Sequence, residues 1–331
     1  MATIKRRTFL KALAGLTMAS TAPVFGLTPR DRLGELLPQR TLGRTGEAVT
    51  MLGVGGFHIG WTGERDAQAV IESALEGGIR FFDTAEAYAR GGSESRYGKY
   101  LTPKYRDDIF LMTKSKDSTA DEARTHIEDS LRRMKTDTLD LWQMHALASP
   151  ADADRRIDNG VLDVFRAARD EGVVRLIGFT GHADPRAHLR MLERTAGEHV
   201  FDTCQLPVNP VDAVHENGFT LSVLPLLVER GIAPLAMKSL ADGRFFAAKN
   251  QHRWTTDDPV VPGRMSIGEA LAFAWSLPVS VLIAGAEHAG FIRDKIKLAR
   301  TYAALSASER AALIETVADL AREGRVEYYK S

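Results

Sequence analysis

The segment Phe81-Phe82-Asp83-Thr84-Ala85-Glu86-Ala87-Tyr88 decides how the rest of the chain is interpreted. The apolar run Ile79 to Phe82 predicts the end of a buried strand, and this strand ends at the carboxylate of Asp83. The phenol of Tyr88 follows on the next loop. An acid and a phenol at one strand end indicate a reaction site, although Asp83 could equally cap a helix and Tyr88 could be an interface aromatic. The neighbouring strands decide between these two interpretations.

A helix–strand unit repeats on both sides of this segment. Strands are expected over residues 51–57, 79–83, 109–114, 139–145, 173–179, 201–205, 232–238 and 279–283. Helices are expected between them, over residues 67–75, 93–101, 119–134, 161–170, 185–194, 219–230 and 266–275. Nearly all-apolar strands that alternate with helices predict a parallel sheet covered by helices.

The number and spacing of these units favour a closed barrel over an open, doubly wound sheet. The ends of three consecutive strands, Asp83, Lys114 and His145, follow one another at intervals of 31 residues. Eight such units fit a (β/α)8 TIM barrel. No Gly-x-Gly-x-x-Gly sequence follows the first strand, which also argues against a dinucleotide-binding fold of the open type.

Other segments flank the predicted barrel. Turn glycines between short extended pieces predict a β-hairpin over residues 40–49, and two helices are expected near 291–298 and 308–323. Residues 28–39 are polar without a clear period and are interpreted as a linker, so the barrel domain is assigned to 40–331. The long segment 241–263 is either a lid over the barrel mouth or a surface excursion.

The N-terminal residues 1–27 resemble a twin-arginine (Tat) signal peptide. Arg6 and Arg7 precede a mildly apolar run from Ala12 to Phe25 that contains small residues. The run is more polar and shorter than the roughly 20 apolar residues of a membrane span, so no stable span is expected after cleavage. The protein is therefore expected in the periplasm, or otherwise exported by the Tat translocation machinery. An uncleaved N-terminal anchor is the alternative.

Composition excludes several classes of function. Lysine plus arginine and aspartate plus glutamate both number 43, so the formal net charge is zero and no nucleic-acid partner is expected. Cys204 is the one cysteine, which excludes an intramolecular disulfide and fits a small buried residue. His58 has no second histidine two residues away, so a metal-dependent hydrolase is weakly supported and no metal site is predicted.

In a barrel of this kind, the side chains at the carboxyl ends of the strands converge on one mouth. Asp83, Lys114 and His145 would meet there, with Tyr88 just beyond the first. Each alone could be a solvated strand-end residue, but three ionisable groups on consecutive strands argue for a site. The set fits carbonyl reduction. A phenol has an unperturbed pKa of about 10, and an ammonium nearby lowers it, so that Tyr88 can act as the acid in reduction and the base in oxidation.

The other three groups have matching roles. Lys114 can supply the ammonium, Asp83 can hold it in place and keep it protonated, and His145 can donate a hydrogen bond to the carbonyl oxygen. At this point Phe82-Asp83-Thr84-Ala85 through Tyr88, Met112-Thr113-Lys114 and Met144-His145 resemble the aldo-keto reductase family. The resemblance covers roughly residues 40–320. It implies the (β/α)8 barrel, the tetrad Asp83, Tyr88, Lys114 and His145, a small-molecule carbonyl or alcohol substrate, and NADP or NAD as cofactor.

The same resemblance implies a set of cofactor-binding positions at the strand ends: Gly55, Gly56, Asp83, Thr180, Gly181, Gln205, Met237, Lys238, Leu240, Gly285 and Ala286. Gly181 stands where the family usually has asparagine, and Met237 where it commonly has a stacking aromatic. Phe291 lies near the place of the usual base for an adenosine 2′-phosphate, and Arg293 or Lys295 could replace that base. The choice between NADP and NAD therefore stays open. A non-catalytic barrel that binds the nucleotide and senses redox state is the competing function.

Overall fold

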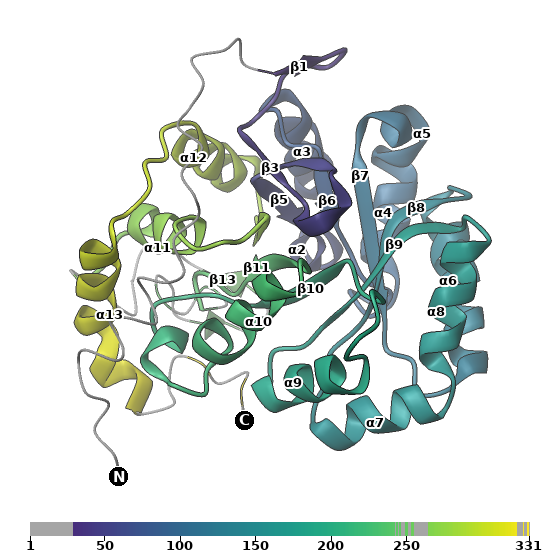
Figure 1. The fold of residues 1–331 in the computed structure, drawn as a ribbon. Helices are drawn as coiled ribbons and strands as arrows, with labels where there is room; N and C mark the ends of the chain where they lie inside the picture. The colour runs from purple at the N-terminus through teal and green to yellow at the C-terminus, as the bar shows by residue number, and fades with distance from the viewer. Residues whose placement is uncertain are drawn as a thin grey trace.

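Eight parallel strands close into a barrel in the computed structural model (Figure 1), which describes residues 29–241, 243, 245, 249–250, 253–254, 264–322, 327 and 330. The barrel strands are β5 (Leu52–Gly55), β6 (Phe81–Asp83), β7 (Phe110–Ser115), β8 (Leu139–Met144), β9 (Val174–Thr180), β10 (Thr203–Pro207), β11 (Ala233–Met237) and β14 (Val281–Gly285). Each pairs in parallel with the next, and β14 returns to β5. The predicted fold class is confirmed.

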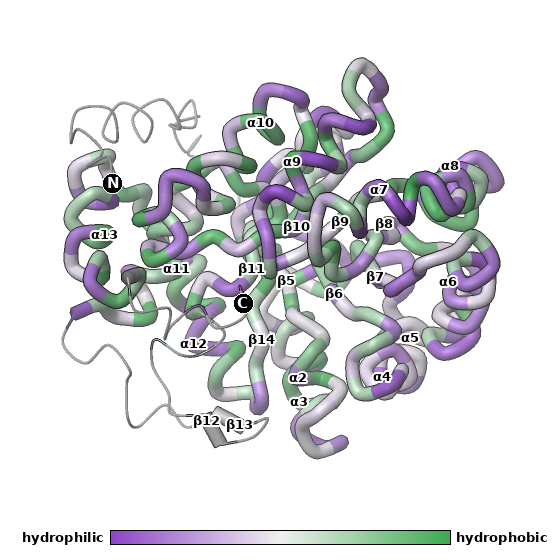
Figure 2. Tube along the Cα trace, turned by 90° about the horizontal axis from the view of Figure 1, so that it is seen from below, coloured by the Kyte–Doolittle hydropathy of each residue, from purple (hydrophilic) through white to green (hydrophobic). Residues whose placement is uncertain are grey.

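Helices surround this barrel, with the strands at the centre of the view in Figure 2. The α-helices are α2 (Gly56–Trp61), α3 (Glu64–Glu76), α4 (Gly92–Tyr100), α5 (Thr102–Tyr105), α6 (Ala120–Met134), α7 (Pro150–Asp158), α8 (Val161–Asp170), α9 (Pro185–Arg194), α10 (Leu224–Glu229), α11 (Ile267–Trp275), α12 (Ala289–Arg300) and α13 (Ala307–Arg322). Short 3-10 turns are η1 (Gly43–Thr45), η2 (Arg106–Asp108) and η3 (Asp212–Val214), and η4 (Phe219–Val223) is a π-helical turn. The two expected C-terminal helices are α12 and α13.

The sequence marks several of these helix starts. Ser266 accepts a hydrogen bond from the backbone N–H of Glu269, and the Glu269 carboxylate accepts one from the backbone N–H of Ser266, which makes a capping box at the start of α11. Thr119 likewise accepts from the backbone of Glu122 at the start of α6. Polar first turns of this kind satisfy amide groups that have no partner within the helix.

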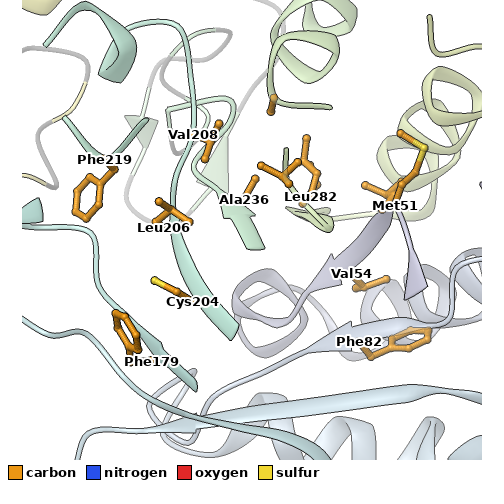
Figure 3. Close-up of a cluster of buried hydrophobic side chains, with 14 of the residues drawn as sticks. Met51, Val54, Phe82, Phe179, Cys204, Leu206, Val208, Phe219, Ala236 and Leu282 are labelled. Carbon is orange, nitrogen blue, oxygen red and sulfur yellow. The ribbon is translucent and has the colours of Figure 1, made fainter. Parts of the chain in front are cut away.

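The apolar core has two parts, one inside the barrel and one between strands and helices. The strands β3 (Gln39–Thr41) and β4 (Ala48–Thr50) form a hairpin that packs Leu42 and Val49 against the inner part. Phe81 and Phe110 stack inside, with ring centroids 4.7 Å apart. The outer part includes Cys204, which lies among Phe179, Leu206 and other side chains in Figure 3. Burial raises the pKa of the Cys204 thiol well above its usual value, so it serves as a small apolar residue.

The expectation of a linker over residues 28–39 is wrong where the structure describes it. β1 (Arg30–Asp31) pairs with β2 (Gly34–Glu35) as a hairpin. Leu36 and Leu37 are buried, and the nearly buried guanidinium of Arg80 pairs with Asp31 at 2.6 Å. Alternation over so few residues leaves no periodic signal, and the partner that orders them lies some fifty positions further along the chain.

Two other expectations need correction or stay open. Gly56 and Phe57 were expected to extend the first strand but begin helix α2. The segment 241–263 lies mostly outside the described residues; within it, β12 (Lys249–Asn250) pairs with β13 (Arg253–Trp254). The signal segment 1–27 lies wholly outside them. In the part of the chain that is described, no helix has the length and apolar character that crossing a membrane requires.

Candidate active site

The strand pairing explains how residues far apart in sequence come to face one space. Asp83 on β6 pairs with Met112 on β7, and Lys114 lies two residues further along β7. In the same way, Lys114 pairs with Gln143 on β8, and His145 lies two residues further on. A shift of two residues preserves the side of the strand on which a side chain lies, while it follows the tilt of strands around a barrel. The site residues are therefore staggered along the strands and all point inward.

A cavity of about 560 Å³ opens at these strand ends. Inward-facing residues in or directly after every barrel strand line this cavity, among them Gly55, Asp83, Lys114, His145, Thr180, Gln205, Met237 and Gly285. Tyr88, Gly181 and Lys238 also line this cavity. The structure thus brings together all four predicted catalytic residues and most of the predicted cofactor positions.

Asp83 and Lys114 form a buried ion pair next to Tyr88. Lys114 Nζ lies 2.5 Å from Asp83 Oδ1 and donates a hydrogen bond of 2.6 Å to the carbonyl oxygen of Thr84. It also donates to the hydroxyl of Tyr88 at 3.4 Å. Both charged side chains are almost completely buried. The ammonium is therefore held within reach of the phenol by two fixed acceptors.

Burial acts on both members of this pair. Loss of hydration raises the pKa of Asp83, and the ammonium of Lys114 partly offsets the effect. Burial likewise lowers the pKa of Lys114, with Asp83 opposing the shift. Each charge stabilises the other at a place where neither would be stable alone.

His145 is buried beside Tyr88, with the two ring centroids 5.6 Å apart. Its pKa lies well below the ordinary value, first because of burial and then because of the positive charges of Lys114 and Lys116. The imidazole is therefore neutral at neutral pH. A neutral imidazole carries one N–H donor, which suits polarisation of a carbonyl oxygen better than proton exchange.

The loop that carries Tyr88 is fixed to the end of β7. The backbone N–H of Glu86 donates to the carbonyl oxygen of Lys114 at 3.0 Å, and the Glu86 carboxylate accepts from the backbone N–H of Lys116 at 2.9 Å. His126 Nδ1 lies 3.3 Å from the same carboxylate and 2.6 Å from Asp117. Ala89 and Arg90 then take left-handed backbone conformations, with φ of 51° and 55°. Such conformations are costly and are retained where they position a functional group.

The opposite side of the cavity fits the amide and phosphate groups of a nicotinamide cofactor. Among the described residues, the side-chain oxygen of Gln205 is buried without a hydrogen-bond partner, and it faces the cavity beside Thr180. A buried acceptor without a partner is costly, and a carboxamide N–H would satisfy it. At Gly181, a Cβ atom would lie 2.5 Å from the carbonyl oxygen of Leu147. The asparagine usual in the family has no room there, which leaves Thr180 and Gln205 for the carboxamide.

Three predicted cofactor positions do not line the cavity. Gly56 is buried at the start of α2, Ala286 is buried, and Leu240 packs against the outer core. Neither of the two candidate bases on α12 lines it either. Arg293 donates to the hydroxyl of Ser73 at 3.1 Å, and Lys295 is buried over the ring of Phe291 with its pKa lowered by burial to about 8.

Sequence reasoning missed several lining residues: Phe57, His58, Ala87, Lys116, Ala146, His182 and Ile283. Lys116 and His182 each stand two residues beyond a predicted site position, at Lys114 and Thr180, which is a signal that could have found them. Phe57 and His58 depend on α2, which the sequence did not predict. Trp61, one turn after Phe57, is 44% exposed with its ring 6.3 Å from that of Phe57.

A second cavity of about 620 Å³ lies beyond the ends of β8 and β9, between Ala148, Arg186, Leu320 and Lys330. None of its described lining residues is a tyrosine. Its lysine, Lys330, pairs with Asp212 and Glu327, each at 2.6 Å. No group of three or more side chains suited to a metal ion occurs within the described ranges. The mouth cavity is therefore the candidate active site.

Comparison with known proteins agrees with this site. The sequence profile of the Aldo/keto reductase family matches residues 51–325. The 6-dehydroglucose reductase of Novosphingobium aromaticivorans is 31% identical over 226 residues, which cover 62% of this chain and 69% of that protein. The L-galactose dehydrogenase of Arabidopsis thaliana is 28% identical over 223 residues, which cover 62% of this chain and 66% of that protein.

A solved structure shows the same fold. The aldo-keto reductase AKR11C1 from Bacillus halodurans, in its holo form, superposes with a TM-score of 0.70 at 23% identity, over 85% of this chain and 96% of that one. From the profile match and the arrangement of the mouth cavity, we conclude that the chain belongs to the aldo/keto reductase family, a family of oxidoreductases that act on carbonyl substrates.

Proposed function

We propose that the protein is an NAD(P)-dependent oxidoreductase that reduces a carbonyl to an alcohol, or catalyses the reverse reaction, with Tyr88 as general acid and base. One observation supports this proposal above the others. Lys114 Nζ contacts the carboxylate of Asp83 and the hydroxyl of Tyr88 within one cavity. A phenol, an ammonium and a carboxylate in that order form a proton donor whose anion is stabilised after the proton leaves.

The roles of the side chains follow from their positions. When bound, the nicotinamide would supply the hydride that reduces the carbonyl carbon. Tyr88 donates its proton to the carbonyl oxygen, and the ammonium of Lys114 stabilises the phenolate that remains. Asp83 keeps Lys114 charged despite its burial. Neutral His145 donates a hydrogen bond to the same oxygen and orients it.

The cofactor side favours NADH over NADPH. Arg293 is directed to Ser73, and Lys295 is buried with a lowered pKa, so neither presents a free cation for a 2′-phosphate. Thr180 and Gln205 would hold the carboxamide, while Lys238 and Gly285 face the space available to the phosphates. Met237 would provide an apolar surface for the nicotinamide ring.

The substrate class that we propose is a small polyhydroxylated carbonyl compound. The related enzymes named above act on a dehydroglucose and on L-galactose. Phe57 is exposed and meets the ring of Tyr88 at a centroid distance of 5.5 Å. Exposed aromatic faces beside the reacting phenol suit the C–H face of a sugar.

The test replaces the reacting phenol. Tyr88→Phe removes the proton donor and keeps the ring that packs on Phe57 and His145. We expect loss of at least about 100-fold in kcat, with NADH affinity unchanged in fluorescence titration. Titration with NADPH alongside measures the cofactor preference. If Tyr88→Phe turned over aldehydes as the unchanged protein does, the role proposed for Tyr88 would be wrong. If the unchanged protein bound NADH but turned over no carbonyl compound, the redox-sensing alternative would be favoured.

We also propose that the N-terminal segment directs export through the Tat machinery with the cofactor already bound. Twin-arginine substrates cross the membrane folded, and the single buried cysteine shows that the fold needs no disulfide formed outside. An enzyme that carried its nucleotide through in this way would not depend on free cofactor in the periplasm.

A further inference from the structure

The described lining of the mouth cavity has more basic than acidic side chains, in a chain whose formal net charge is zero. Among the described residues, its ionisable groups are the phenol of Tyr88, the carboxylate of Asp83 and the basic side chains of Lys114, Lys116, Lys238, His58, His145 and His182. Asp83 and Lys114 neutralise each other as an ion pair. Lys116 and Lys238 are the other two ammonium groups of this described lining.

These two ammonium groups lie on opposite arcs of the barrel. Lys238 directly follows β11, next to β14 and β5, the strands that carry Gly285 and Gly55. This is the arc proposed above for the cofactor phosphates. Lys116 directly follows β7, between β6 and β8, the strands that lead to Asp83 and His145. The cofactor accounts for Lys238, but Lys116 stands on the arc where the carbonyl reacts.

No carboxylate within the described residues neutralises Lys116. The nearby acidic side chains have other partners. Asp117 accepts a hydrogen bond from Ser115 and pairs with His126. The Glu86 carboxylate accepts from the backbone N–H of Lys116 and lies beside the same His126. Lys116 has an exposed side chain that still lines the cavity. Its charge is one cause of the low pKa of His145, which shows that its field reaches the reacting groups.

We propose that the substrate is an anion, a carbonyl compound that bears a carboxylate, and that Lys116 binds this carboxylate. The inference rests on the proposed function and specifies its substrate class. Lys116 would be a specificity-determining residue at the rim of the cavity. Attraction between opposite charges in a partly enclosed cavity strengthens binding and is weakened by salt.

A matched pair of aldehydes tests the proposal on the intact protein: 4-formylbenzoate and 4-formylbenzamide. They have nearly the same shape and differ in charge, and neither hides its carbonyl in a ring. We expect kcat/KM to be higher for the benzoate by roughly 3- to 10-fold, the range for a single partly solvated charge pair. This preference should shrink as ionic strength rises.

Variants assign the preference to one residue. Lys116→Gln should reduce the benzoate-to-benzamide ratio of kcat/KM to near one, Lys116→Arg should retain it, and Lys104→Gln, an exposed lysine away from the cavity, should leave it as it was. A ratio near one in the unchanged protein, or a ratio that Lys116→Gln does not alter, would overturn the inference while leaving the oxidoreductase proposal intact. Turnover of neither aldehyde would contradict both.

Discussion

At the scale of single residues, the active site depends on charges placed where water cannot reach them. Asp83 and Lys114 are both nearly inaccessible, and taking two such groups out of water costs several kcal/mol for each ion before their attraction offsets it. A salt bridge of this kind is poor at stabilising a fold. It is effective at keeping the ammonium of Lys114 charged 3.4 Å from the hydroxyl of Tyr88, because water cannot reach Asp83 or Lys114 to replace the contact between them.

Buried histidines give the protein a dependence of stability on pH that can be predicted. His188 is buried among Phe179 and Phe219, and burial lowers its pKa from 6.5 to about 4. Below about pH 6.5, His188 therefore binds a proton in the unfolded chain, whereas in the folded chain it stays neutral until the pH approaches 4. The contribution of His188 to stability is intact above this pH and is lost as the pH falls towards 4. At about pH 5 the loss amounts to about 2 kcal/mol relative to neutral pH.

Chemical denaturation at about pH 7 and about pH 5 measures this effect through a difference between variants. Carboxyl groups whose pKa is raised by burial, such as that of Asp140, act in the opposite direction. The dependence of stability on pH in the unchanged protein is therefore the sum of both effects. His188→Leu should lose less stability on acidification than the unchanged protein, by about 2 kcal/mol. His199→Gln, at an exposed position, should keep the original slope. Equal slopes for all three proteins would show that His188 does not titrate as described.

At the scale of elements, the period of two along each strand sorts residues between the barrel interior and the helix layer. Phe110, Met112 and Lys114 alternate with Leu111 and Thr113 along β7, and Phe110 and Met112 belong to the inner core while Leu111 belongs to the outer one. Lys114 continues the inward row at the point where the barrel opens. The ammonium of Lys114, for which we propose a catalytic role, is thus the last member of a core-facing series.

Helix packing gives a prediction at the same scale. Gly98 on α4 lies against α6 so closely that a Cβ atom would be 2.0 Å from the carbonyl oxygen of Arg133. Gly98→Ala should destabilise the fold by roughly 2 kcal/mol because backbone must move, although alanine has the higher helix propensity. Thermal unfolding of the purified variant measures the change.

The matched control for this variant is Gly268→Ala on α11. There the nearest atom to the added Cβ would be the methyl group Cδ2 of Leu298, at 3.2 Å, and this flexible side chain can move aside. This substitution should be neutral or stabilising by up to about 1 kcal/mol. If both variants unfolded at the temperature of the unchanged protein, the close approach of α4 and α6 would be refuted.

At the scale of the whole molecule, closure of the barrel sets two arcs of the mouth opposite each other. The arc of β6, β7 and β8 carries the groups that we propose to react, and the arc of β11, β14 and β5 carries small and apolar residues beside Lys238. Only closure places β14 beside β5, across more than two hundred residues of chain.

Export is a property of the whole chain and is predicted from its first residues. Changing Arg6→Lys and Arg7→Lys together should retain the protein in the cytoplasm, because a paired arginine is the distinguishing feature of this signal. Fractionation of cells followed by immunodetection measures the distribution. Arg30→Lys, the same exchange at an exposed position beyond the signal, is the control. An unchanged distribution of the double variant would exclude the twin-arginine route.

Local patterns in the sequence were sufficient to predict the barrel and the residues proposed for catalysis. Apolar runs at regular spacing specify strands that must be buried on both faces, and Asp83, Lys114 and His145 stand at their ends because strand length and period are local properties. The hairpin over residues 39–50 was equally visible, since turn glycines act locally.

Features that depend on distant neighbours became visible in the folded molecule. Asp31 pairs with Arg80, and the backbone N–H of Leu37 donates to the carbonyl oxygen of Gly78. A Cβ atom at Gly56 would collide with the carbonyl oxygen of Asp83, and one at Gly181 with that of Leu147. The role that we propose for Lys116 also depends on the tertiary structure. Its position at the rim opposite Lys238 follows from barrel closure, which no local pattern of residues encodes.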